Sequence, residues 1–176
     1  IRIRIFNHST PEAIRAMRAN LIDLAVVTTP MSLKKPLEKI PLSKCKEILI
    51  CGPKYSYLTD TAKSLKDLIE IPLISLSEGT GTYDLYNKFY IAHSVPFTPD
   101  MEVATTDQII PMITHNLGIG FYPEDLATEL IEDKKVFPIN IEEKLPIREV
   151  CLVKNKSSAM STSVQKFYNF LRNSVS

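Results

Sequence analysis

The chain has 176 residues, of which 44% are hydrophobic, and its 21 Lys and Arg against 20 Asp and Glu give a formal net charge of +1. Such a composition is typical of a globular protein long enough to bury a sizeable core, and no apolar stretch is long enough to span a bilayer. DNA-binding modules usually carry a strong basic excess, so the balanced charge argues against DNA binding by these residues alone.

Strands and helices alternate from the start of the chain. In residues 1–6 isoleucines alternate with arginines, which is the period-two pattern of a strand. Thr10 and Pro11 then predict the cap and first turn of a helix that ends near Asn20. Residues 24–27 form a continuous apolar run, which is typical of a buried parallel strand.

The same alternation continues to the end of the chain. Further strands are predicted at residues 46–51, 73–76, 102–104, 117–122, 136–139 and 148–153. Helices are predicted after Ser64, Thr82, Asp107, Pro123 and Ser161. The basic stretch 34–46 is interleaved with proline and glutamate and indicates a solvated connector. Strands that alternate with helices predict an α/β fold with mostly parallel sheets flanked by helices.

The cysteines and histidines do not form a recognisable site. The sequence holds Cys45, Cys51 and Cys151, an odd number without Cys-x-x-Cys spacing. This pattern argues against a disulfide framework and a zinc site and favours buried thiols in a cytoplasmic protein. The three histidines lie in separate predicted elements, so no metal site is expected.

The loop from Ser77 to Thr82 is the most informative polar segment. Gly79 and Gly81 free the backbone, while Ser77, Thr80 and Thr82 supply hydroxyls before a predicted helix. Helix amino termini attract anions, so these residues are candidates for binding a small polar or anionic molecule. Ordinary helix capping is an equal alternative. A Walker lysine and the third glycine of a dinucleotide fingerprint are both absent, which argues against ATP and NAD.

Secondary candidates lie at the ends of other predicted strands. Thr28 and Thr29 follow a buried strand, where one hydroxyl reaches a ligand while the other satisfies the backbone; capping by both is the alternative. Thr106 precedes the predicted cap Asp107, and Tyr122 ends a strand where it closes a pocket rim or simply fills the core.

No catalytic site is predicted. The chain lacks a Gly-x-Ser-x-Gly elbow and a cysteine beside a histidine motif, and its paired carboxylates lie in charged stretches. We therefore expect neither catalysis nor a cofactor.

Three stretches carry a family resemblance. They are Asp-Leu-Ala-Val-Val-Thr at residues 23–28, the segment 73–82, and Leu-Gly-Ile-Gly-Phe-Tyr-Pro at residues 117–123. In their order and spacing they resemble the effector-binding domain of LysR-type transcriptional regulators, across nearly all of the chain. The resemblance implies two lobes of the type 2 periplasmic-binding-protein kind, joined by two crossover strands, with a small effector held between them.

The resemblance also implies domain limits and partners. Residues 1–42 with 146–176 would form the first lobe, and residues 43–145 the second. The family's effector contacts map onto the threonines already singled out. A homodimer or homotetramer with side-by-side antiparallel lobes is implied, and residues 83–91 are a candidate for part of that surface.

Two features of the family are not found in this sequence. The DNA-binding winged helix-turn-helix is absent, so DNA binding is expected only from a longer parent protein. The sequence also lacks counterparts of the first strand and first helix of the family's effector-binding domain.

Two other functions compete with regulation. A solute-binding protein of a transporter has the same fold but needs a signal sequence or lipid anchor upstream. An enzyme of the prephenate dehydratase kind also shares the fold, but its Thr-Arg-Phe motif is absent.

Overall fold

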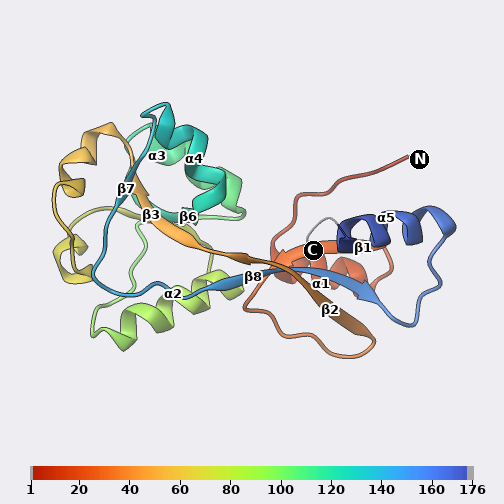
Figure 1. Cartoon of the computed structure of the whole chain (residues 1–176). Helices are drawn as coiled ribbons and strands as arrows, with labels where there is room; N and C mark the ends of the chain where they lie inside the picture. Colours follow the sequence, from red (N-terminus) through yellow and green to blue (C-terminus); the bar gives the residue numbers. More distant parts are fainter. Residues whose placement is uncertain (1, 174–176) are drawn as a thin grey trace. The chain divides into compact units, whose positions relative to one another are not determined.

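The computed structural model describes residues 2–173 and contains two compact units (Figure 1). Unit 1 is formed by residues 1–45 and 148–176, and unit 2 by residues 46–147. Each unit has its own sheet and helices, so the predicted α/β fold class is confirmed. No helix within residues 2–173 has the length and apolar character of a membrane span.

Unit 1 is built around a three-stranded sheet with β8 at its centre. Its elements are α1 (Thr10–Arg18), β1 (Leu24–Thr28), β2 (Leu37–Cys45), β8 (Arg148–Asn155) and α5 (Thr162–Asn173). Strand β8 pairs antiparallel with β1 on one side and with β2 on the other. Met17, Val27 and Val153 belong to the core that α1 covers. The ammonium of Lys154 lies 4.7 Å from the centre of the Tyr168 ring of α5.

Unit 2 has a five-stranded mixed sheet in the order β5-β4-β6-β3-β7. Its strands and α-helices are β3 (Glu47–Cys51), β4 (Leu73–Leu76), α2 (Gly81–Ala92), β5 (Met101–Val103), α3 (Ile109–Thr114), β6 (Ile119–Pro123), α4 (Glu124–Glu132) and β7 (Phe137–Ile139). Three short 3-10 helices complete it, η1 (Pro53–Thr59), η2 (Leu65–Leu68) and η3 (Thr106–Gln108). Strand β4 runs parallel to β5 and β6, whereas β3 runs antiparallel to β6 and β7.

Two apolar clusters cover the two faces of this sheet. Leu49 and Phe121 belong to one cluster, and their chain neighbours Ile50 and Tyr122 belong to the other. This division follows from the period of two along a strand, which sends successive side chains to opposite faces. Tyr86 of α2 stacks on Phe121, with ring centroids 4.0 Å apart.

The direction of the strands differs from the prediction. Among the described residues, four of the six strand pairings are antiparallel, so the sheets are not mostly parallel. Residues 24–27 lie in β1, which is antiparallel to β8, and Val26 is 55% exposed rather than buried. A continuous apolar run does not report the direction of the neighbouring strand, which here is set by the return of β8 to unit 1.

The predicted strand at residues 1–6 is not formed. Residue 1 lies outside the described residues, and residues 2–9 have no regular structure. Ile3, Ile5 and Phe6 are exposed, because no described strand supplies the hydrogen-bonding neighbour that an alternating sequence needs. The helix that follows is capped by Ser9, through a capping box with Glu12, and not by Thr10.

The prediction of a solvated connector at residues 34–46 is also wrong, because β2 occupies most of it. Leu37 and Cys45 are buried, and Pro41 lies where the register with β8 shifts, a position that tolerates a missing amide donor. Ion pairs join β2 to β8 from Lys39 to Glu149 and from Lys154 to Glu38. The charged residues that suggested a connector therefore lie on the exposed face of β2.

Cys45 and Cys51 end β2 and β3, which lie in different sheets. All three cysteines are buried, and none of them forms a disulfide. Burial raises the pKa of the Cys51 thiol from 9.0 to about 11.

This raised pKa predicts alkaline destabilisation. The unfolded chain releases the Cys51 proton at lower pH than the folded chain, so the stabilisation is complete below pH 9 and is lost as the pH rises toward about 11. The free energy of unfolding should fall by up to about 3 kcal/mol over this range, at about 1.4 kcal/mol per pH unit between the two pKa values. Denaturant unfolding of wild type and Cys51→Ala at a series of pH values measures this contribution.

Val136→Ala is the matched control, because Val136 is as buried as Cys51 but does not titrate. An equal pH slope in Cys51→Ala and Val136→Ala would contradict the assignment.

Candidate functional site

A small pocket lined by both polar and apolar side chains lies in unit 2 at the carboxyl end of β4. It is lined by Glu47, Ile74, Ser75, Leu76, Thr82, Tyr86, Thr106, Ile109 and Phe121. Its volume of about 10 Å³ corresponds to roughly one water molecule. The pocket thus brings together a carboxylate, three aliphatic hydroxyls and a phenol from segments far apart in the sequence.

Strand direction explains why these groups meet. Because β4 and β5 are parallel, α2 and η3, which follow them, begin at the same edge of the sheet. Because β3 is antiparallel to β6, its first residue Glu47 pairs with Pro123 at the end of β6 and reaches that edge as well.

Glu47 and Tyr86 form the buried floor of the pocket. Their exposed fractions are 4% and 2%, and the Tyr86 hydroxyl donates a hydrogen bond to Glu47 Oε2. A buried carboxylate is costly unless it accepts hydrogen bonds. The stacking of Tyr86 on Phe121 fixes the ring that carries this donor.

The hydroxyls of the predicted loop have different roles. Ser77 Oγ donates to the carbonyl of Val103 at 3.1 Å. Thr80 Oγ1 donates to the carbonyl of Ser77 at 2.8 Å and accepts from the amide of Tyr83 at 3.2 Å, so it caps α2. Gly79 has a φ of +83°, which favours glycine. Ser77, Gly79 and Thr80 therefore shape the loop, whereas Thr82 lines the pocket.

Thr106 also lines the pocket, at the first position of η3. The predicted cap Asp107 lies inside the first turn, and the N-cap is Thr105, which forms a capping box with Gln108. The Gln108 side chain accepts from the amides of Ala104 and Thr105, so this reciprocal bonding fixes the start of the turn.

Tyr122 lies on the other face of the sheet from Phe121. It is 8% exposed and packs in the cluster that contains Ile50 and Ile113. Burial raises the pKa of its phenol, and the negative charge of Asp107 adds to the effect. The expected role of Tyr122 in ligand binding stays a prediction.

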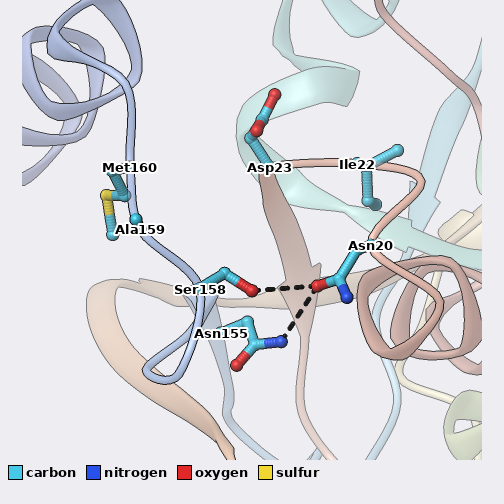
Figure 2. Close-up of a pocket in the computed structure, with 7 residues that line it drawn as sticks. All are labelled: Asn20, Ile22, Asp23, Asn155, Ser158, Ala159 and Met160. Atoms are coloured by element: carbon cyan, nitrogen blue, oxygen red, sulfur yellow. Dashed lines mark hydrogen bonds between the residues drawn. The ribbon is translucent and has the colours of Figure 1, made fainter.

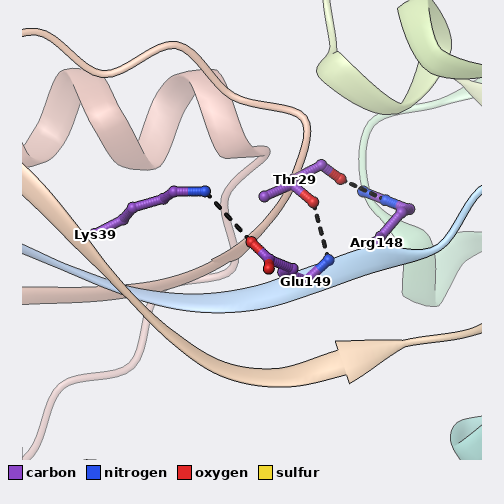
Figure 3. A network of polar contacts seen from close by, with 4 residues as sticks. All are labelled: Thr29, Lys39, Arg148 and Glu149. Atoms are coloured by element: carbon purple, nitrogen blue, oxygen red, sulfur yellow. Dashed lines mark hydrogen bonds and ion pairs between the residues drawn. The ribbon is translucent and has the colours of Figure 1, made fainter.

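Thr28 and Thr29 form hydrogen bonds with Arg148 and Glu149 within unit 1. Arg148 Nη2 donates to Thr28 Oγ1, and Arg148 Nε donates to the Thr29 carbonyl at 2.6 Å. The Glu149 amide donates to Thr29 Oγ1 at 2.9 Å (Figure 3). Both hydroxyls therefore hold the end of β1 against β8, although each keeps a proton to donate.

A second pocket lies in unit 1, with a volume of about 190 Å³ (Figure 2). It is lined by Asn20, Ile22, Asp23, Asn155, Ser158, Ala159 and Met160. Ser158 Oγ and Asn155 Nδ2 both donate to Asn20 Oδ1, at 2.9 and 3.1 Å. None of the predicted binding residues lines this pocket.

Sequence reasoning missed the buried polar residues Glu47, Ser75, Tyr86 and Arg148. Two weak signals existed: Ser75 interrupts the apolar strand 73–76, and Glu47 precedes an apolar run. In residues 2–173 there is no group of three His, Cys, Asp or Glu arranged to hold a metal ion.

The candidate oligomer surface at residues 83–91 contains both buried and exposed side chains. Tyr86, Phe89 and Tyr90 are buried in unit 2, and Ile91 is 63% exposed. The buried aromatic side chains of α2 therefore contribute to the core of unit 2, and an oligomer surface at residues 83–91 stays a prediction.

The cap formed by Thr80 yields a stability prediction. Thr80→Val keeps the volume but removes the oxygen that accepts from Tyr83, so the free energy of unfolding should fall by about 1 kcal/mol. Thr128→Val, at an exposed position of α4, should change it by less than about 0.5 kcal/mol. Denaturant titration measures the free energy of unfolding of both variants. Equal decreases in the two variants would exclude a capping role for Thr80.

Comparisons with known proteins agree with this fold. A family model, the LysR substrate binding domain, matches residues 1–176. No curated protein sequence matches the chain.

Several solved structures are similar. The effector binding domain of QuiR in complex with shikimate has a TM-score of 0.82 and 17% identity, covering 98% of this chain and 80% of that one. The CcmR regulatory domain of Synechocystis PCC6803 in complex with 2-PG has a TM-score of 0.78 and 16% identity, covering 99% and 82%. The apo-form regulatory domain of HypT from Salmonella typhimurium has a TM-score of 0.77 and 16% identity, covering 98% and 82%. These likenesses show the fold, and because the family model spans every residue, the chain belongs to the LysR substrate-binding domain family.

Proposed function

We propose that this LysR-type regulatory domain senses its effector with the polar pocket of unit 2. The observation that carries the proposal is the convergence of Glu47, Ser75, Thr82 and Thr106 at the carboxyl end of β4. Ligands of α/β sheets bind at such edges, where helix amino termini and strand ends gather.

The lining favours a small polar ligand with hydrogen-bond donors. Its three aliphatic hydroxyls both donate and accept, and the carboxyl oxygens of Glu47 accept. The lining includes no lysine or arginine, so an anionic group of the ligand would be stabilised by the amino terminus of α2 rather than by a side-chain cation. Two similar structures were solved with shikimate and with 2-PG, which supports a ligand of this size and polarity.

The pocket must open to admit a metabolite, because about 10 Å³ is far below the few hundred Å³ of a typical ligand site. Thr82 and Thr106 are half-buried, whereas Glu47 and Ser75 are buried. We therefore expect the two threonines to meet the ligand first and the floor to move little.

Thr28 and Thr29 are proposed as additional contacts from unit 1. The hydrogen bonds from Arg148 and Glu149 hold both threonines in place and leave their hydroxyl protons free to be donated. Because these contacts come from unit 1, the variant Thr28→Val tests them separately.

Regulation requires binding and a change of conformational equilibrium, with no chemical step. An allosteric coupling of this kind is typically worth about 1 to 3 kcal/mol. We propose that the domain has no catalytic activity. We also propose that it works in the cytoplasm, where its buried thiols stay reduced, and as a homodimer or homotetramer. The family match favours this function over that of a transporter's solute-binding protein.

A ligand screen tests the proposal. A ligand at a hundred times its dissociation constant stabilises a protein by about 2.7 kcal/mol, which raises the Tm by roughly 5 to 10 °C at this chain length. Thermal unfolding with a panel of hydroxylated carboxylates, phosphorylated acids and amino acids should give such a shift for at least one class. Tm values that stay unchanged throughout a panel of these classes count against the proposed ligand chemistry.

Variants of the rim then locate the site. Thr82→Val and Thr106→Val each remove a hydroxyl with little change of volume, so the affinity for the ligand found in the screen should fall roughly tenfold. Thr128→Val is the control, and Thr28→Val reports on unit 1 separately. Isothermal titration calorimetry measures the ligand affinity of all four variants. Wild-type affinity in both Thr82→Val and Thr106→Val would refute ligand binding in this pocket.

A further inference from the structure

The larger pocket of unit 1 lies apart from the residues proposed to contact the effector. It is formed by the turn after α1 and the turn after β8, and its volume is about 190 Å³ (Figure 2). Asp23 lines the pocket immediately before β1, whereas Thr28 and Thr29 lie at the carboxyl end of the same strand. The pocket and the two threonines therefore lie at opposite ends of β1.

The side chain of Asn20 joins the two turns. Asn20 follows α1 with a φ of +54°, and the amides of Asn20 and Leu21 donate to carbonyls of the helix. Glycine fits such a helix end with less strain, so the backbone alone does not explain an asparagine here. Asn20 Oδ1 accepts hydrogen bonds from Ser158 Oγ at 2.9 Å and from Asn155 Nδ2 at 3.1 Å (Figure 2). These bonds fix the amide group of Asn20 at the wall of the pocket.

The same hydrogen bonds leave amide donors for a ligand. Both lone pairs of Asn20 Oδ1 are used, whereas no described residue accepts from Asn20 Nδ2. Asn155 Nδ2 donates one hydrogen to Asn20 and keeps the other, and Asn155 Oδ1 accepts from the amide of Ser157. This side of the pocket therefore offers N–H groups, which suit a carboxylate because its two oxygens accept several hydrogen bonds.

Asp23 supplies the opposite chemistry. Unit 1 contains 13 Lys and Arg but only 4 Asp and Glu. Glu12 accepts hydrogen bonds in the cap of α1, and Glu38 and Glu149 form ion pairs with lysines. Within residues 2–173, the exposed carboxylate of Asp23 has no ion-pair partner. Figure 2 shows this carboxylate apart from the hydrogen-bonded group around Asn20. The pocket thus has a negative end and an end with amide donors.

We propose that this pocket binds a small amino acid with an apolar side chain. The ammonium group of the ligand pairs with Asp23, and its carboxylate accepts from the amides of Asn20 and Asn155. Its side chain packs against Ile22 and Met160, which line the same pocket. A volume of about 190 Å³ is below the few hundred Å³ of a typical ligand site, so the side chain must be small. Because every lining residue belongs to unit 1, this site is independent of the proposed effector site.

The two ends of the pocket argue against a ligand with a single charge. A simple carboxylate meets the amide donors but is repelled by the negative charge of Asp23. A simple amine pairs with Asp23 but leaves the amide donors without acceptors. It also enters a unit whose 13 basic and 4 acidic side chains give a formal charge of +9. A zwitterion satisfies both ends, because an amino acid carries its ammonium and carboxylate groups on the same carbon.

Calorimetric titration of the whole chain with three compounds of similar shape tests this recognition. L-Valine carries both charges, isobutylamine carries only the ammonium group, and isovalerate carries only the carboxylate. L-Valine should bind at least roughly tenfold more tightly than either of the others, because each of them lacks one of the two charged contacts.

Variants then assign the contacts. Asp23→Asn removes the charge with little change of volume, so the affinity for L-valine should fall roughly tenfold while the affinity for isovalerate does not fall. Asn20→Gly keeps a residue that favours the left-handed backbone but removes the amide, so it should also weaken L-valine binding. Asp125→Asn is the control, because it makes the same charge change at an exposed position of unit 2 and should leave the affinity unchanged.

The outcomes separate this site from the pocket of unit 2. A wild-type chain that does not bind L-valine at millimolar concentrations overturns the amino-acid site and leaves the proposed effector site standing. Equal affinities for L-valine and isovalerate, or for L-valine and isobutylamine, overturn the recognition of both charges. Wild-type affinity in Asp23→Asn, together with a loss in Thr82→Val, places L-valine in the pocket of unit 2 and likewise overturns the amino-acid site in unit 1.

Discussion

The antiparallel pairing of β3 with β6 is the constraint on which the site of unit 2 depends. Parallel strands alone would bring the starts of α2 and η3 to one edge, but they would leave the start of β3 at the opposite edge. The reversal places the buried carboxylate of Glu47 beside hydroxyls that arrive from helix amino termini. A single change of strand direction therefore turns an ordinary strand edge into a polar pocket.

The polar residues near this edge divide into those that build it and those that face it. Ser77 and Thr80 form hydrogen bonds within the loop and at the cap of α2, whereas Thr82, two residues after Thr80, lines the pocket. In unit 1, Thr28 and Thr29 hold the end of β1 against β8. Some of these neighbouring hydroxyls therefore hold the backbone in place, whereas others line the pocket and are candidates for ligand binding.

Local patterns predicted the elements whose signals are local. The strand at residues 73–76 has the expected limits, and Ser64 caps η2 as predicted. The predictions failed where pairing with a distant strand decides the outcome. Residues 2–6 belong to an alternating stretch but pair with no strand of the described part of the chain, and β2 is charged but is held by β8. The burial of Glu47 could not be predicted for the same reason, because it depends on β6, which lies more than seventy residues away in the sequence. Thr82 and Thr106 could be predicted because strand ends and helix starts are recognisable in sequence.

The structure of the domain with the ligand that stabilises it tests the central claim most directly. The account predicts that the ligand contacts the hydroxyls of Thr82 and Thr106 at the carboxyl end of β4, with Glu47 and Tyr86 still hydrogen-bonded beneath it. A ligand bound instead in the larger pocket around Asn20 and Ser158, with the edge of β4 unchanged, would contradict the account.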